Sequence, residues 1–169
     1  MPLKWNNQER ELLQTLDTIL REQGVRAEIN AIAANLASKL NGSPGRQLAK
    51  EPVRLELFGE NLPGDIRACW VYLMRSPSAT GEERHPNSHQ RTISYQGMGE
   101  FQLRQLPVTG GLSEWKRNVL LSDLSSRLEF RWISIPPNRW HKAVATEGDW
   151  IMVSFHTAPE NELIEEHPA

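Results

Sequence analysis

The sequence has few of the features that mark whole classes of protein. A single cysteine, Cys69, excludes an internal disulfide framework and a zinc ribbon. The longest apolar stretches, residues 68–74 and 150–155, are far too short to cross a bilayer. The first residues contain no apolar segment of the kind found in secretory signals. We therefore expect a cytoplasmic protein without a membrane partner.

The chain also lacks a strong excess of charge and the common cofactor motifs. The formal net charge is −2 with both signs interspersed, which gives no reason to expect a nucleic-acid partner. There is no glycine-rich phosphate loop, no serine nucleophile elbow and no Cys-x-x-Cys pair. Nucleotide-dependent hydride transfer and serine hydrolysis are therefore unsupported, and 169 residues suffice for one domain.

The chain divides into a helical beginning and a strand-rich remainder. Residues 6–40 have two amphipathic stripes, and Asn6 or Asn7 is placed to cap the first helix. We expect residues 1–45 to form a two-helix extension that packs on residues 46–169, within a single domain. Short apolar runs with turn residues between them predict strands near 53–57, 66–74, 92–95, 100–106, 128–135, 143–146 and 150–156. This pattern is typical of an antiparallel sandwich or barrel, an all-β fold.

Four polar residues stand at informative places in the strand-rich part. Glu83 and His85 are two apart, so an extended backbone places both side chains on one face. Gln90 follows after a turn, and His141 follows a second, proline-rich turn. A carboxylate, two imidazoles and an amide that converge inside a barrel predict a site for a divalent first-row metal.

The spacing of these residues resembles the two motifs of the cupin superfamily. The first motif corresponds to Glu83-x-His85, four residues, Gln90, six residues, Gly97; the second motif ends at His141. Glu83 replaces the family's first histidine, and Gln90 replaces its glutamate. The resemblance implies a double-stranded β-helix, the cupin jelly-roll barrel. It also implies that Glu83, His85 and His141 are metal ligands.

Within this superfamily the chain is most similar to the cysteine or thiol dioxygenases. The segments 85–89 (HPNSH) and 153–156 (VSFH) resemble segments of that family. The resemblance implies that His156 and Ser154 form part of a proton relay, in which Ala158 replaces a tyrosine. Three residues are candidates for substrate binding: Arg54, Trp140 and Gln90.

The sequence therefore predicts a metal-dependent cupin, a thiol dioxygenase-like oxidoreductase for a small thiol or carboxylate. Fe(II) is the favoured metal, with Mn, Ni and Zn as alternatives, and the substituted slots leave open a site without metal. Two other readings stay open: a non-catalytic ligand-binding or regulatory cupin, and a metal-free isomerase or epimerase cupin. The expected partner is a small-molecule substrate, and the resemblance allows a homodimer.

Overall fold

The computed structural model describes residues 4–105 and 114–169. Two helices lead the described chain, α1 (Asn7–Leu20) and α2 (Gln23–Asn41). Of the two predicted caps, Asn6 is the one used, because its side chain accepts a hydrogen bond from the Glu9 backbone N–H at 2.8 Å. No helix within residues 4–105 and 114–169 is long and apolar enough to span a bilayer.

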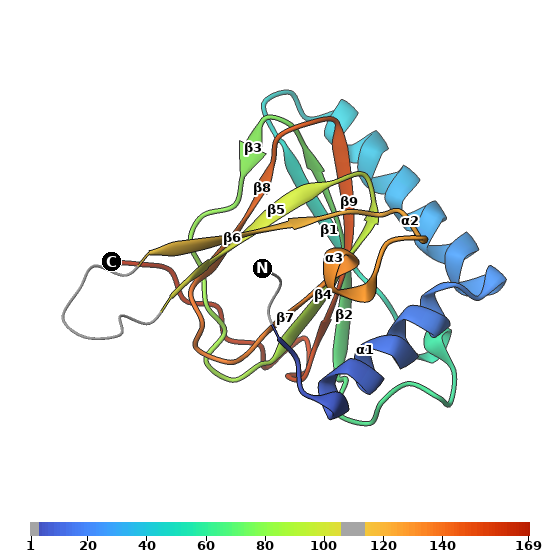
Figure 1. Ribbon diagram of the computed structural model, residues 1–169. Helices are drawn as coiled ribbons and strands as arrows, with labels where there is room; N and C mark the ends of the chain where they lie inside the picture. Colours follow the sequence, from blue (N-terminus) through green and yellow to red (C-terminus); the bar gives the residue numbers. More distant parts are fainter. Residues whose placement is uncertain (1–3, 106–113) are drawn as a thin grey trace.

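The strands form two antiparallel sheets that face each other (Figure 1). The five-stranded sheet, here sheet A, has the order β1 (Leu48–Pro52), β2 (Ala68–Arg75), β9 (Asp149–His156), β4 (Gln90–Gln96), β7 (Trp132–Ile135). The four-stranded sheet, sheet B, has the order β3 (Ser78–Ala79), β8 (His141–Ala145), β5 (Gly99–Arg104), β6 (Trp115–Leu120). Strands distant in sequence are neighbours in both sheets, as in a jelly roll.

Two of the expected strands are partly helical. Residues 55–58 form a 3-10 helix, η1 (Leu55–Phe58), and the strand precedes it as β1. Residues 128–131 form a short helix, α3 (Leu128–Arg131), and only the second half of the expected strand is β7. Alternating apolar residues alone could not tell a strand from one helical turn at these places.

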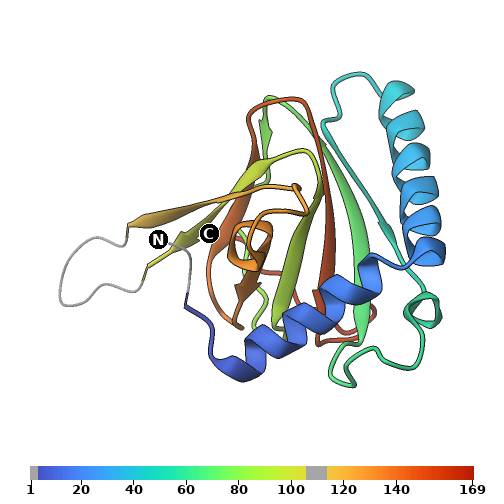
Figure 2. The ribbon, with the colours of Figure 1, turned by 45° about the vertical axis from the view of Figure 1, so that its right-hand side comes forward.

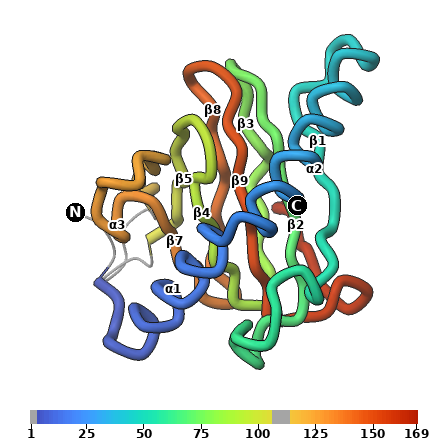
Figure 3. The backbone as a smooth tube through the Cα atoms, turned by 90° about the vertical axis from the view of Figure 1, so that its right-hand side faces the viewer, coloured from blue at the N-terminus to red at the C-terminus, as the bar shows by residue number. Residues whose placement is uncertain are grey.

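Sheet A is buried on both faces, because the helices cover its outer face (Figures 2 and 3). Along β9 the side chains alternate between the two faces. Ile151, Val153 and Phe155 join the core beneath α1 and α2, whereas Trp150 and Met152 join the core between the sheets. This double burial explains why the whole run reads as apolar rather than alternating.

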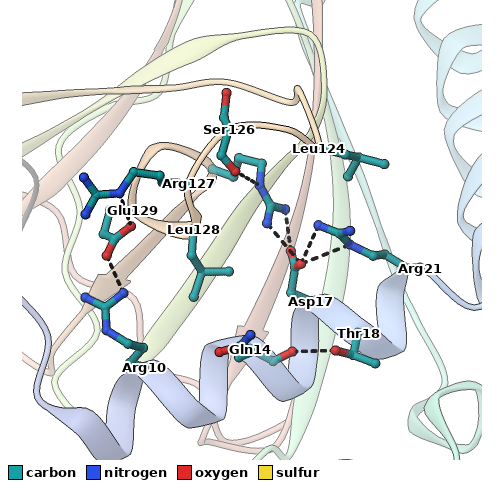
Figure 4. A pocket seen from close by; sticks show the side chains of 11 residues that line it. Arg10, Gln14, Asp17, Thr18, Arg21, Leu124, Ser126, Arg127, Leu128 and Glu129 are labelled. Atoms are coloured by element: carbon teal, nitrogen blue, oxygen red, sulfur yellow. Dashed lines mark hydrogen bonds and ion pairs between the residues drawn. The ribbon is translucent and has the colours of Figure 1, made fainter.

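Charged side chains fasten α1 and α3 to each other and to sheet A. Asp17 of α1 is buried and accepts hydrogen bonds from the guanidinium of Arg131 and from the Trp132 indole N–H. Arg21 donates to the same carboxylate at 3.1 Å (Figure 4). Glu129 of α3 is paired with Arg10 of α1. Residues of α1 and α3 line a cleft with a volume of about 510 Å³. Each carboxylate here is neutralised by arginine, so the cluster has a clear structural role.

Two glycines permit a close backbone approach at the turn from β4 to β5. Gly97 has a φ of 80°, and a Cβ atom there would lie 2.3 Å from the Asp149 carbonyl oxygen. A Cβ atom on Gly99 would lie 2.1 Å from the Trp150 ring. The glycine in the resemblance motif is thus required by both conformation and space.

Candidate metal centre

Glu83, His85 and His141 lie close together in the folded chain. Glu83 and His141 form an antiparallel bridge with two backbone hydrogen bonds of 2.9 Å. The Glu83 Oε1 atom lies 3.4 Å from His141 Nε2 and 4.0 Å from His85 Nε2. One ligand atom from each residue falls within a span of 4.8 Å. The three predicted ligands are therefore brought together, His85 and His141 buried and Glu83 half-buried.

The hydrogen bonds of the two imidazoles decide which nitrogen faces the carboxylate. His85 Nδ1 lies 3.1 Å from the Ile164 carbonyl oxygen, and His141 Nδ1 lies 2.9 Å from the Arg139 carbonyl oxygen. A carbonyl oxygen only accepts, so Nδ1 carries the hydrogen in both rings. In a neutral ring Nε2 then has a free lone pair, which is the form that binds metals.

The protonation of these groups leaves a cation site. Burial, followed by the neighbouring His141, lowers the pKa of His85, so His85 is neutral near pH 7. Burial raises the pKa of Glu83, but the side-chain hydrogen bond with His141 and the attraction between the two groups lower it more, so Glu83 is ionised. His141 Nε2 is buried and has no hydrogen-bond partner. The close contact between the Glu83 carboxylate and His141 Nε2 needs a positive charge, either a proton on Nε2 or a metal ion in its place.

The separations of the three groups fit a metal ion. Ligands about 2.0–2.2 Å from a metal stand about 3.0–3.5 Å apart at tetrahedral or octahedral angles. The Glu83–His141 separation of 3.4 Å lies in this range, and the Glu83–His85 separation of 4.0 Å needs only a small side-chain adjustment. Two histidines and one carboxylate with open positions are a ligand set of non-haem Fe(II) sites.

His156 and Gln90 lie beside the three ligands on the inner face of sheet A. They are direct partners in the register of β4 and β9, so their side chains share this face. The ring of His156 packs edge-on against that of His85, with centroids 5.1 Å apart. His156 Nε2 and Gln90 Oε1 are both buried without a hydrogen-bond partner. Such unpaired polar atoms suggest a bound polar molecule nearby.

Ser88 decides the orientation of His156. Its Oγ accepts hydrogen bonds from the backbone N–H groups of Thr157, at 3.1 Å, and Ala158, at 3.3 Å. Its own hydrogen therefore points to an acceptor, and His156 Nδ1 at 3.2 Å is nearer than the His89 carbonyl at 3.4 Å. His156 thus carries its hydrogen on Nε2, the opposite of the two ligand histidines.

The tautomer makes His156 a donor beside the metal site rather than a fourth ligand. Burial holds the pKa of His156 well below its usual value, so the ring is neutral. Its Nε2–H and the Gln90 Oε1 acceptor form a complementary pair for a polar ligand. Trp70 packs edge-on against the His156 ring at 5.3 Å and supplies an apolar wall.

Ser154, predicted as the relay serine, has a different partner. Its hydroxyl lies 2.6 Å from Thr92 Oγ1, which also accepts from Gln90 Nε2 at 3.1 Å. The hydroxyl that contacts His156 is that of Ser88. Ser88 lies inside the segment HPNSH, residues 85–89, so the sequence motif could have identified it as the serine that contacts His156.

The other candidates lie outside this inner group. Arg54 is exposed at the N-terminus of η1. Trp140 is half-buried between Arg84 and Arg104, whose guanidinium carbons lie 4.7 and 5.8 Å from its ring centroid. His89 lies on the outer face of sheet A, where its Nε2 is 2.6 Å from the Ser134 hydroxyl. Gln90 is therefore the substrate-binding candidate that the fold places nearest His156.

Several solved structures share this fold at low sequence identity. A vicilin from Capsicum annuum aligns with a TM-score of 0.56 at 16% identity, over 74% of this chain and 32% of that chain. An oxalate oxidase in complex with the substrate analogue glycolate aligns with a TM-score of 0.53 at 12% identity, over 72% of this chain and 56% of that chain. The DMSP lyase DddQ from Ruegeria pomeroyi DSS-3 aligns with a TM-score of 0.50 at 15% identity, over 72% of this chain and 51% of that chain.

These likenesses confirm the predicted jelly-roll fold of the cupin type with a helical N-terminal extension. The chain spans between about a third and just over half of the length of these structures. No protein-family model and no curated protein matches the sequence.

Proposed function

We propose that this cupin-fold chain is a metal-dependent oxidoreductase that acts on a small thiol or carboxylate. Glu83, His85 and His141 would hold one divalent first-row metal. The observation that carries the proposal is the buried, unpartnered His141 Nε2 that faces the Glu83 carboxylate at 3.4 Å. A metal ion bound by both groups would take the place of the proton that this contact otherwise needs on Nε2.

Fe(II) is the metal we favour, with Mn, Ni and Zn as alternatives. A set of two histidines and one carboxylate leaves several positions open. When bound, such a metal can hold substrate and dioxygen side by side. Two of the similar structures are named as an oxalate oxidase and a DMSP lyase, so the fold is compatible with chemistry on small organic molecules.

The chain's own residues would bind and orient the substrate. His156 would donate its Nε2 hydrogen to an oxygen of the bound substrate, and Ser88 would hold that tautomer. Gln90 would accept a hydrogen bond through its unpartnered Oε1. Arg54 and Trp140 are weaker candidates, since Arg54 is exposed and Trp140 is stacked between two arginines. Ser154 would act through Thr92 and Gln90 rather than as the relay serine.

For a thiol substrate the reaction is R–SH plus O2 giving R–SO2H. The O–O bond breaks, two S–O bonds form, and sulfur loses the four electrons that dioxygen gains. The thiol proton ends on a sulfinate oxygen. The reaction needs no external reductant, so the metal and the two substrates suffice.

Elemental analysis after anaerobic loading with Fe(II), Mn(II), Ni(II) or Zn(II) tests the metal site. We expect about one metal ion per chain, reduced to background in Glu83→Ala and in His141→Ala. His89→Ala is the matched control, because it removes a histidine from the opposite face of sheet A. Full metal content in Glu83→Ala or His141→Ala contradicts the ligand assignment.

Oxygen consumption by the iron-loaded protein tests the reaction. Small thiols that also carry a carboxylate or an amine are the first substrates to screen. Mass spectrometry of the product should show the addition of two oxygen atoms. A metal-loaded protein that consumes no oxygen with any of these thiols contradicts the dioxygenase assignment and leaves the metal assignment intact.

A second candidate function is the non-catalytic binding of an organic ligand. The observation in its favour is the pair of unpartnered polar atoms, His156 Nε2 and Gln90 Oε1. Native mass spectrometry of the freshly purified protein would show a bound molecule without metal. In the metal-free isomerase, His85 rather than His156 would be the general base, because the inferred His156 tautomer leaves no free lone pair on Nε2.

A further inference from the structure

The C-terminal segment, residues 162–167, lies along residues 82–87, which carry two of the three proposed ligands. Arg84 and Glu166 form a two-way backbone bridge, with N–O distances of 3.1 and 3.0 Å. Their side chains also pair, with the Arg84 Nε atom 2.6 Å from a Glu166 carboxylate oxygen. His167 Nδ1 lies 3.1 Å from the Glu82 carbonyl oxygen. The tail is thus docked at several points on the side of the barrel away from α2 (Figure 1).

This segment supplies the outer hydrogen bond of one proposed ligand. The Ile164 carbonyl oxygen lies 3.1 Å from His85 Nδ1. The corresponding partner of His141 is the carbonyl of Arg139, only two residues away in the chain. His141 is therefore oriented by its own turn, whereas His85 is oriented by a segment 79 residues distant.

We propose that the C-terminal segment is a working part of the metal centre, because it fixes the tautomer and the ring orientation of His85. This inference rests on the proposed metal site. An outer partner that holds Nδ1–H keeps the Nε2 lone pair on the metal and increases the basicity of the ligand. Without the segment, His85 loses that partner and exchanges between tautomers and ring rotations.

Asn87 holds the C-terminal segment through two side-chain hydrogen bonds. Its side-chain Nδ2 donates to the Glu162 carbonyl at 2.7 Å, and its Oδ1 accepts from the Ile164 N–H at 3.0 Å. These two bonds lie on either side of Leu163, just before the Ile164 carbonyl that contacts His85. Asn87 is exposed, and it is not a proposed ligand. A change at Asn87 can therefore loosen the segment without removing a metal-binding atom.

Metal affinity of the full-length protein tests the inference. Competition against a chromophoric chelator gives the Kd for Zn(II) and Co(II). We expect Asn87→Ala to weaken binding about ten-fold, and deletion of residues 160–169 to weaken it up to about a hundred-fold. Asn35→Ala is the matched control, since it removes an exposed asparagine that bonds Glu51 instead, and its affinity should be unchanged.

The protonation of His85 gives a readout that a general loss of stability would not move. Long-range 1H–15N NMR spectra of the metal-free protein should show His85 with its hydrogen on Nδ1. In Asn87→Ala and in the shortened chain the His85 signals should shift towards a mixture of tautomers, while those of His141 stay unchanged. A peptide of residues 160–169 added to the shortened chain should restore both the spectrum and the affinity.

The outcomes separate this inference from the proposed function. If the full-length protein binds neither metal, the proposed function and the inference both fail. If it binds metal and both variants bind equally well with an unchanged His85 tautomer, only the inference fails. Circular dichroism of each variant confirms that the barrel remains folded.

Discussion

Asp17 and Glu83 are carboxylates on opposite sides of sheet A, and they differ in the side chains that contact them. Asp17, beneath α1, accepts hydrogen bonds from Arg131, Trp132 and Arg21. Among the described residues, Glu83 has no guanidinium or indole partner and lies 3.4 Å from His141 Nε2 and 4.0 Å from His85 Nε2. The first carboxylate is held by permanently charged and N–H donors of the protein, whereas the second is grouped with two imidazoles in a set that could hold a metal ion.

The difference separates a structural charge from a functional one. A buried charge with guanidinium and N–H partners stabilises one arrangement of two elements, as the Asp17 cluster does for α1 and α3. A carboxylate grouped with imidazoles can bind a ligand. Functional sites commonly retain such groups although they reduce the stability of the fold. Partner type therefore distinguishes the two sites, although all the acids involved are partly or wholly buried.

The largest effect on stability should come from Asp17→Ala. The change leaves the Arg131 guanidinium buried without its partner and the Trp132 N–H unbonded. We expect a loss of about 3–5 kcal/mol in the free energy of unfolding. Urea unfolding followed by tryptophan fluorescence measures it, with the exposed Glu11→Ala on the same helix as control. A loss below 1 kcal/mol would show that the cluster is not structural.

Metal should stabilise the folded protein only through the inner site. At a free metal concentration one hundred times the Kd, binding raises the free energy of unfolding by about 2.7 kcal/mol. Thermal unfolding with and without metal should show this rise for the wild type and for His89→Ala. Glu83→Ala should show none, and an equal rise in that variant would place the metal elsewhere.

The acids of the outer face should make stability depend on pH. Burial raises the pKa of Asp17 and of Glu9, but hydrogen bonds from Arg131 and Trp132, and from Arg91 and Ser134, lower both below their usual values. Each pair therefore stabilises the fold above the usual carboxyl pKa, and this contribution is lost as the pH falls through the lowered value. Unfolding free energies at pH 6 and pH 3 should differ less in Glu9→Gln than in the wild type. An unchanged difference contradicts the assigned pKa shift of Glu9.

The smallest effect on stability should come from Glu83→Gln without metal. No guanidinium loses a partner, and a neutral amide can donate to the free Nε2 of His141. We expect a change within about 1 kcal/mol, in either direction, from urea unfolding in the presence of a chelator. A loss as large as that of Asp17→Ala would mean that Glu83 is a structural charge after all.

Most of the fold could be predicted from the sequence. Apolar periodicity placed α1, α2 and the long central strands, since period and burial are tied along a regular element. It failed where one helical turn replaces a strand, at residues 55–58 and 128–131. It also missed the short edge strands β1 and β3 and the exposed strand β6, which carry too few buried residues to show a pattern.

The sequence by itself determined the three candidate ligands. The two-residue spacing of Glu83 and His85 places both on one face of an extended segment, and the turn before His141 supplies the third ligand. Alternation along a strand accounts for the pairing of Glu83 with His85. The assignment of all three residues as metal ligands came from the resemblance to the cupin motifs.

Only the tertiary structure decided which atoms of these ligands are available. The Ile164 carbonyl, remote in sequence, selects the tautomer of His85, and Ser88 rather than Ser154 selects that of His156. A tautomer depends on hydrogen-bond partners brought in by other segments, and a strand pattern carries no information about them. The sequence therefore determined where a metal could bind, and the packing of the chain's end decided how its ligands are held.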